Sequence, residues 1–293
     1  MKTKIVILTP VYNDWKNLGK LLGKINELFK RKVNFKFDLV IVNDGSKGKY
    51  NFKKYKLKTI NKITIISLSK NVGSQRAIAI GIKYLSNYNH KNFKTIIIDS
   101  DGQDNPEAII KMLSISQKNK SSSIAVNRGQ RKEPLWFKFF YEIYGLIIKL
   151  LCVKKIRFGN FSLLNFKHLI KISNRDELWS AFPPTLSKCI NRLTYLNVDR
   201  EKRYSGDSKM NFFGLIFHAL KVFSVLKLRI FISSTLYIIL SYHFLFSENS
   251  FLFYSIVSVL LLLNISNFLI SFDNKNNFYN NFKKISIVTI RNN

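Results

Sequence analysis

Four acidic residues lie close together in the chain and offer the clearest chemistry in the sequence. Asp99, Asp101, Asp104 and Glu107 are four of only 17 acids among 293 residues. Clustered carboxylates repel one another unless a cation shares their site, and oxygen ligands suit a hard divalent ion. Because the cluster directly follows the apolar run 95–98, it favours a divalent metal at the end of a buried strand over a solvated turn.

Several other binding classes are excluded. An EF-hand loop starting at Asp99 would need Gly at its sixth position, where this chain has Asp104. It would also need an acid at its twelfth position, where this chain has Ile110. No Walker A or GxGxxG pattern is present, so ATPases and dinucleotide-binding proteins lack their phosphate-binding loops here. The two cysteines, Cys152 and Cys189, match no metal spacing, which excludes a zinc module or a disulfide scaffold.

The composition indicates a globular protein with a strong positive charge. Hydrophobic residues make up 46% of the chain, and 48 Lys and Arg against 17 Asp and Glu give a net charge of +31. This charge suits nucleic acid, an anionic membrane or a polyphosphate ligand, and compositional bias towards Lys explains it equally well. No nucleic-acid recognition module is visible, so a nucleic-acid partner is not expected.

Before and after the acidic cluster, the chain alternates between short β-branched runs and helix-length amphipathic segments. The runs are 4–9, 38–42, 63–68, 95–98 and 123–126, and the helical segments are 14–30, 74–85 and 106–117. This alternation predicts an α/β domain around a largely parallel sheet, in which ligands bind beyond the carboxyl ends of the strands. Polar residues follow each run, so we expect them at one edge of the sheet.

These polar loops together resemble a known family. The segments are Thr9-Pro10-Val11-Tyr12-Asn13, Val42-Asn43-Asp44-Gly45-Ser46, Asn71-Val72-Gly73-Ser74 and Asp99-Ser100-Asp101-Gly102-Gln103-Asp104. In this order they resemble family 2 glycosyltransferases of the GT-A fold, and within that family the polyprenyl-phosphate glycosyltransferases, which include the dolichol-phosphate mannose synthase group. Taken alone, Asp44 is as readily a turn former before Gly45 and Ser46.

The resemblance implies a donor site made of two overlapping sets of residues. The nucleotide of a UDP- or GDP-sugar would be held by Pro10, Tyr12, Asp44, Asn71 and Asp99. Mg²⁺ or Mn²⁺ would be coordinated, together with the donor diphosphate, by Asp99, Asp101 and Gln103. Such a metal neutralises the charge on the departing nucleoside diphosphate.

Two basic segments resemble the parts of the family that handle phosphate. Arg128 and Arg131 precede an amphipathic stretch, 135–151, and are candidates for a lipid phosphate, because Arg forks suit phosphate oxygens. Arg203 and Lys209 match a late family element that closes on the diphosphate. Solvated basic turns are the alternative reading of both segments.

One residue departs from the family pattern. Many relatives have Gly-Asp-Phe where this chain has Gly159-Asn160-Phe161, so a carboxylate proposed as catalytic base is absent. A hydroxyl acceptor needs a base, whereas a phosphate monoester is mostly dianionic at neutral pH and attacks without one. Asn160 therefore favours a phosphate acceptor, with Asp104 left as an unassigned candidate base.

Two long uncharged stretches near the C-terminus predict a membrane hairpin. Residues 230–246 and 251–272 contain no Lys, Arg, Asp or Glu. The one charged residue in the turn between them is Glu248. Basic residues flank both stretches, so the positive-inside rule puts both flanks in the cytoplasm. Residues 211–228 read as an interfacial helix or, almost equally well, as a cytosolic core helix. A buried hairpin in a soluble core is the alternative for the two spans.

We therefore expect a GT-A domain (1–209), an interfacial amphipathic helix (210–228), two transmembrane helices (229–273) and a cytoplasmic tail (274–293). The leading hypothesis is an inverting transferase that moves a sugar from a nucleotide-sugar to a polyprenyl phosphate at the cytoplasmic membrane. The alternatives are a transferase that glycosylates a hydroxyl of a lipid-linked glycan, and a non-catalytic basic membrane-anchored binding protein. Self-association of the hairpin into a homo-oligomer stays open.

Overall fold

The computed structural model divides into two compact units, formed by Met1–Arg131, Arg157–Ser208 and Asn276–Asn293, and by Lys132–Ile156 and Lys209–Lys275. The structure describes residues 4–32, 36–48, 57–88, 92–119, 121–129, 142, 145–146, 149–151, 158–206, 212–283 and 285–291.

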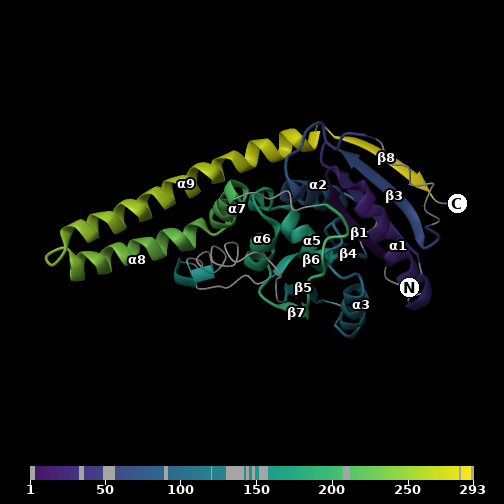
Figure 1. Ribbon diagram of the computed structural model, residues 1–293, viewed down its shortest axis with the longest axis horizontal. Coiled ribbons are helices and arrows are strands. Elements are labelled where there is room, and N and C mark those ends of the chain that lie inside the picture. The colour runs from purple at the N-terminus through teal and green to yellow at the C-terminus, as the bar shows by residue number, and fades with distance from the viewer. Residues whose placement is uncertain are drawn as a thin grey trace. The chain divides into compact units, whose positions relative to one another are not determined.

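The first unit is built on an eight-stranded sheet with the order β7-β5-β6-β4-β1-β2-β3-β8 (Figure 1). Its strands are β1 (Lys4–Val11), β2 (Phe37–Asn43), β3 (Ile60–Ser67), β4 (Phe93–Ile97), β5 (Ser123–Arg128), β6 (Phe158–Asn165), β7 (Leu193–Val198) and β8 (Ser286–Arg291). β6 and β8 run antiparallel to their neighbours and every other pair is parallel. The mostly parallel α/β sheet expected from the sequence is confirmed.

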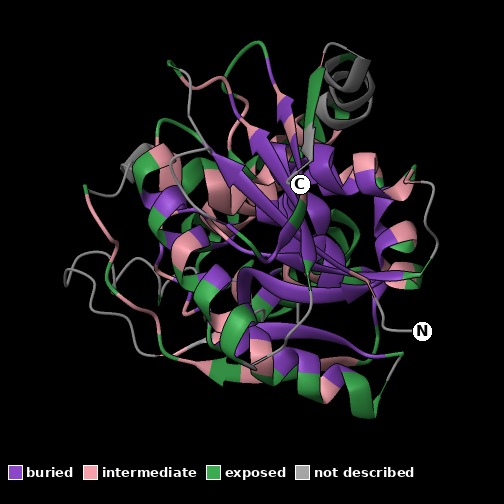
Figure 2. Cartoon of the chain, turned by 90° about the vertical axis from the view of Figure 1, so that its right-hand side faces the viewer, coloured by how far each residue is buried: buried purple, intermediate pink, exposed green. Residues whose placement is uncertain are grey.

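Helices cover both faces of the sheet, so its central strands are buried on both sides (Figure 2). On one face, α1 (Trp15–Lys32) and α3 (Ala108–Lys118) contribute Leu22 and Met112 to a buried hydrophobic cluster that also contains Ile7 of β1. The opposite face is covered by α2 (Ser74–Ser86), α5 (Phe166–Ser173), the 3-10 helix η2 (Asp176–Trp179) and α6 (Phe182–Cys189). This double cover leaves the loops at the ends of the central strands as the accessible part of those strands.

The second unit contains α7 (Phe212–Val225), α8 (Lys227–Leu245) and most of α9 (Ser250–Lys283). α8 and α9 run side by side as a hairpin (Figure 1), with the Lys227 ammonium 2.9 Å from the Ser271 hydroxyl near one end and the rings of Phe246 and Phe253 5.4 Å apart at the other. The segments Lys227–Leu245 and Ser250–Phe272 are long and apolar enough to cross a membrane.

Large apolar side chains along this hairpin are exposed, which would be costly in water. Phe251 is 83% exposed and Leu262 67% exposed, and Phe231, Phe244, Ile265 and Phe272 are likewise exposed. A hydrocarbon environment would remove this cost. The hairpin expected from the sequence is present, and among the described residues its large apolar side chains are exposed rather than packed in a core.

The last strand was not expected. β8 follows α9 and pairs with β3, from Lys62 opposite Arg291 to Ser67 opposite Ser286. Residues that the sequence indicated only as a tail therefore complete the edge of the first unit's sheet.

Candidate active site

The acidic loop lies at the carboxyl end of β4, between that strand and α3. Ile98 continues the pairing with β1 through a hydrogen bond from its N–H to the Leu8 carbonyl, 3.1 Å long. The chain then turns at Gly102, where φ is +80°, and the Gln103 N–H donates to Oδ1 of Asp101 at 3.0 Å. Asp101 and Asp99 are both half-buried, and Asp104 is buried.

Asp44 is buried and joins the loop after β2 to the loop after β3. Its two carboxylate oxygens accept the N–H groups of Val72 at 2.7 Å and Gly73 at 2.9 Å. Burial raises the pKa of Asp44, and the two N–H donors act against that shift because they favour the ionised form. The close approach requires the neighbouring glycine, since a Cβ on Gly45 would lie 2.7 Å from the backbone nitrogen of Asn71.

The loop after β1 joins the same group through Asn13, which has a left-handed backbone (φ 48°). Its N–H donates to Ser46 Oγ at 2.9 Å, and its side-chain oxygen accepts the Lys47 N–H at 2.8 Å. Asn tolerates this conformation better than most residues. Nearby, Pro10 is buried while Tyr12 is 37% exposed. The three loops that the sequence assigned to the nucleotide therefore form one connected edge.

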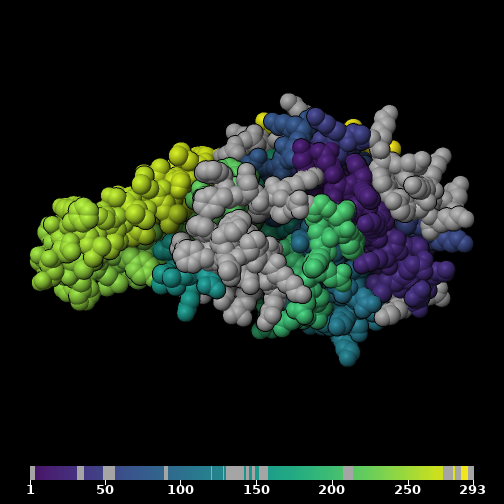
Figure 3. All heavy atoms as spheres, viewed as in Figure 1, coloured from purple at the N-terminus to yellow at the C-terminus, as the bar shows by residue number. Residues whose placement is uncertain are grey.

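A segment after β7, residues 199–206, lies along the acidic loop, and we call it the strap. Its backbone is fixed by hydrogen bonds from Glu201 N–H to the Gln103 carbonyl at 2.8 Å and from Tyr204 N–H to the Asp101 carbonyl at 3.2 Å. Packing is tight, because a Cβ on Gly102 would lie 2.2 Å from the Tyr204 ring. In the space-filling view the strap (green) lies against α1 (purple) (Figure 3).

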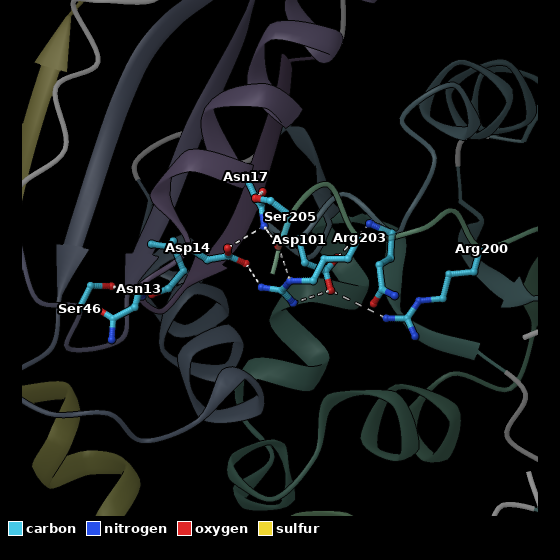
Figure 4. A network of polar contacts seen from close by, with 10 residues as sticks. Asn13, Asp14, Asn17, Ser46, Asp101, Arg200, Arg203 and Ser205 are labelled. Atoms are coloured by element: carbon cyan, nitrogen blue, oxygen red, sulfur yellow. Dashed lines mark hydrogen bonds and ion pairs between the residues drawn. The ribbon is translucent and has the colours of Figure 1, made fainter. Parts of the chain in front are cut away.

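Arg203 of the strap reaches two acids (Figure 4). It forms an ion pair with Asp14, at the start of α1, and its Nη1 lies 3.5 Å from Oδ2 of Asp101. Asn17 supports this arrangement by donating to Asp14 Oδ1 at 2.8 Å and to the Ser205 carbonyl at 2.9 Å. Arg200 lies 4.0 Å from the same Asp101 oxygen. The strap thus brings two guanidinium groups to the acidic loop, where they would also suit a diphosphate.

Asn160 is buried beside Asp99. Its side-chain amide donates to both oxygens of that carboxylate, at 2.9 and 3.2 Å. Where many members of the resembled family have an Asp proposed as catalytic base, this chain therefore has a hydrogen-bond donor to Asp99.

The oxygens at this site match a hard divalent ion in type. Among the described residues no three His, Cys, Asp or Glu side chains gather as a metal centre. The set indicated by the sequence has only two carboxylates, Asp99 and Asp101, with the Gln103 amide, so an ion here would take further oxygens from a bound ligand. Oxygen-only ligation suits Mg²⁺ or Mn²⁺.

The structure gathers most of the site residues named from the sequence. Asp99, Asp101, Gln103 and Arg203 belong to the acidic loop and strap, while Asp44 and Asn71 belong to the linked loops. Arg131, Lys209 and the side chain of Arg128 lie outside the described residues.

Sequence reasoning gave no role to Asp14, Asn17 or Arg200. Asp14 could have been noticed as one of few acids, immediately after the first polar loop. The other two carry no comparable signal in the sequence.

Solved structures show which class of fold this is. Glucosyl-3-phosphoglycerate synthase from Mycobacterium tuberculosis, crystallised with Mn²⁺, UDP-glucose and phosphoglyceric acid, superposes with a TM-score of 0.53 at 13% sequence identity. The match covers 78% of this chain and 80% of that one. The chain therefore has the GT-A glycosyltransferase fold, as the resemblance implied.

The family follows from the sequence comparison. Residues 6–178 match the model of glycosyl transferase family 2, and the chain belongs to that family. An uncharacterised glycosyltransferase of Synechocystis is 28% identical over 239 residues, 78% of this chain and 72% of that protein. The undecaprenyl-phosphate 4-deoxy-4-formamido-L-arabinose transferase of Pseudomonas savastanoi is 23% identical, over 77% of this chain and 67% of that enzyme. The expected likeness to polyprenyl-phosphate transferases is confirmed.

Proposed function

We propose that this protein is a membrane-bound, metal-dependent inverting glycosyltransferase that moves one sugar from a UDP- or GDP-sugar to a polyprenyl phosphate. Family 2 membership supports sugar transfer, and relatives named as undecaprenyl-phosphate transferases support the lipid. The single observation that carries the choice of acceptor is the hydrogen bonding of Asn160 to Asp99.

An amide that donates to Asp99 cannot take a proton from an incoming hydroxyl. Asn160 is 5% exposed and is held by the carboxylate, so this position supplies no general base. A phosphate monoester has a second pKa of about 6 and is mostly dianionic at neutral pH, so it attacks the anomeric carbon without one. The chemistry at Asn160 therefore favours a phosphate acceptor over a hydroxyl.

On the donor side, Asp99, Asp101 and Gln103 would hold Mg²⁺ or Mn²⁺ with the diphosphate. A bound metal would supply charge neutralisation for the leaving nucleoside diphosphate. Arg203 and Arg200 lie at the same loop and would bind diphosphate oxygens. Asp44 would contribute by holding the 72–73 loop beside the nucleotide.

Chain connectivity supports a hairpin that enters and leaves the membrane on the catalytic side. β7 precedes the two spans and β8 follows them, yet both strands belong to one sheet. A chain that starts and ends in one sheet crosses a bilayer an even number of times. With basic residues on both flanks, the catalytic domain and both termini are assigned to the cytoplasmic side of the inner membrane.

The test is transfer to lipid in isolated membranes. Membranes containing the protein are incubated with polyprenyl phosphate, Mg²⁺ or Mn²⁺ and radiolabelled UDP- and GDP-sugars, and label in the organic extract is counted. Asp101→Asn is expected to abolish the label, whereas Asp176→Asn, the same change away from the site, is expected to leave it.

Mild acid distinguishes the acceptors by what it releases, because it cleaves the anomeric phosphate linkage of either product. Metal-dependent label released as a free monosaccharide supports the proposal and identifies the sugar. Label released as part of a larger glycan, or not released at all, would reassign the acceptor to a hydroxyl. Absence of label from every donor, together with absence of nucleotide-sugar binding, would leave a non-catalytic binding protein.

A further inference from the structure

A chain of four hydrogen bonds runs from the backbone of α6 through the side chains of Gln75 and Asn160 to Asp99. The Phe182 N–H donates to Gln75 Oε1 at 2.8 Å, and Gln75 Nε2 donates to Asn160 Oδ1 at 2.8 Å. Asn160 Nδ2 then donates to Asp99, at 2.9 Å to Oδ1 and 3.2 Å to Oδ2. Four segments distant in sequence thus meet in one line: α6, α2, β6 and the acidic loop.

The direction of this line is fixed at both ends. A backbone N–H can only donate, so Gln75 must turn its oxygen to Phe182 and its NH₂ to Asn160. An ionised carboxylate can only accept, so Asn160 must turn its NH₂ to Asp99 and its oxygen to Gln75. Amide orientations are otherwise ambiguous, but here the two ends demand the same one.

The position of Gln75 connects this line to the nucleotide loops. Gln75 is the second residue of α2, and the helix is preceded by Gly73, whose N–H is held by Asp44. The backbone of Gln75 therefore belongs to the helix that begins at the donor loop. Its side-chain amide is linked through Asn160 to the acidic loop. The hydrogen bonds through α2 and Asn160 thereby connect the element that begins after Gly73 with Asp99.

We propose that Gln75 is a positioning residue for sugar transfer: through Asn160 it fixes the orientation of the Asp99 carboxylate and couples that orientation to the nucleotide loop. The inference rests on the proposed function, because Asp99 matters here as a ligand of the metal and donor diphosphate. It also gives Asn160 a role of its own, as an oriented donor to Asp99. An Asp at position 160 would instead place an acceptor against Asp99 and interrupt the line.

The decisive variant reverses polarity without changing shape. Gln75→Glu can still accept from the Phe182 N–H, but its second oxygen then faces Asn160 Oδ1. To bond the new carboxylate, the Asn160 amide must rotate and turn its oxygen towards Asp99. Gln75→Leu removes the hydrogen bonds without adding charge, and Gln117→Glu makes the same charge change at an exposed position of α3.

Two readouts separate positioning from stability. Binding of Mn²⁺ with UDP, and of Mn²⁺ with GDP, is followed by electron paramagnetic resonance of the full-length protein in detergent, alongside its melting temperature. We expect Gln75→Glu to lower the nucleotide-dependent affinity for Mn²⁺ by about tenfold or more, which is the effect of losing a hydrogen bond to a charged group. Gln75→Leu should lower this affinity less, and Gln117→Glu should leave it unchanged. In transfer assays the KM for the donor should rise in Gln75→Glu while the KM for the lipid acceptor stays constant.

The outcomes distinguish this inference from the function on which it rests. A wild-type protein that gives no nucleotide-dependent Mn²⁺ signal would overturn both. A wild-type signal that Gln75→Glu leaves unchanged would overturn the positioning role alone. Equal losses of Mn²⁺ affinity in Gln75→Glu and Gln75→Leu, in proportion to their melting temperatures, would mean that Gln75 acts only through packing. That result would also overturn the positioning role.

Discussion

The guanidinium of Arg203 lies 3.5 Å from the carboxylate of Asp101, and so connects the strap after β7 with the acidic loop after β4. The same guanidinium pairs with Asp14 at the start of α1 (Figure 4). The acidic loop is therefore held between the sheet and the segment that leads towards α7. Substitutions in the strap should therefore change both the free energy of unfolding and the binding of the donor at the acidic loop.

The Asp14 and Arg203 pair should contribute measurably to stability. Their side chains are only 14% and 18% exposed, so water screens the pair less than a surface ion pair. In a double-mutant cycle of Asp14→Ala and Arg203→Ala we expect a coupling of ~1–3 kcal/mol in the free energy of unfolding.

A second ion pair provides the comparison for this cycle. Glu177 and Lys188 are 2.7 Å apart, but their side chains are 27% and 41% exposed. Their cycle should give a coupling below ~1 kcal/mol. A coupling at Asp14 and Arg203 no larger than at this pair would contradict the structural role of Arg203.

Gly102→Ala should loosen the strap. The residue has φ +80°, and its new Cβ would lie 2.2 Å from the Tyr204 ring, so both the backbone and the contact are strained. We expect a loss of about 1–3 kcal/mol in the free energy of unfolding, together with weaker donor binding. In a Tyr204→Ala background the same substitution should cost less, because the clash is then absent.

The matched control is Gly23→Ala in α1, where a Cβ would meet nothing within 4 Å. There the change should stabilise the protein by about 0.5–1 kcal/mol, because Ala favours a helix more than Gly. Thermal or denaturant unfolding of both variants in detergent measures the difference. Equal effects of the two substitutions would contradict the constraint at Gly102.

His168 should make stability fall on acidification. Its Nδ1 lies 2.8 Å from Ser123 Oγ, and its pKa is lowered by burial and then by the nearby Lys171 and Lys167. The unfolded chain, with a pKa of about 6.5, then binds the proton more readily than the folded protein. The contribution of neutral His168 to the free energy of unfolding is thus fully present above about pH 6.5. It is lost as the pH falls through the lower pKa of the folded protein.

The measurement is the free energy of unfolding of wild type and His168→Gln between pH 5 and about 7.5, the range in which histidine titrates. The wild type should lose more stability than the variant as the pH falls. Parallel curves for the two proteins would assign the dependence to other groups.

The turn between α8 and α9 should face the side of the membrane opposite the catalytic domain. In a chain with Cys152 and Cys189 replaced, Ser247→Cys should react with a membrane-impermeant maleimide added to intact cells. Ser121→Cys, in the first unit, should react only after the membrane is opened. The reverse pattern would overturn the cytoplasmic assignment.

The elements of the first unit, and the polar residues that follow them in the chain, could largely be predicted from the sequence alone. Alternating apolar runs predicted β1 to β5 and α1 to α3 to within a few residues, because burial between two helical layers imposes that pattern locally. The uncharged stretches likewise predicted α8 and the apolar part of α9, since length and absence of charge are properties of the segment alone.

The later strands β6 and β7 were not predicted, because their character depends on neighbours that are far away in the chain. β8 illustrates this most clearly: SIVTIR becomes a strand by pairing with the edge of β3, and nothing within the tail indicates that partner. Strand pairing is a relation between segments, so a local pattern cannot specify it.

For the site, the types of residue were readable but their connections were not. Asp99, Asp101 and Asp44 could be named from their places after apolar runs, since a parallel sheet gathers such loops at one edge. The ion pair of Arg203 with Asp14, and the hydrogen bonds from Gln75 to Asn160 and from Asn160 to Asp99, became visible only in the folded structure. Hydrogen bonds and ion pairs act over a few ångströms, so they depend on where the folded elements bring each side chain rather than on its position in the sequence.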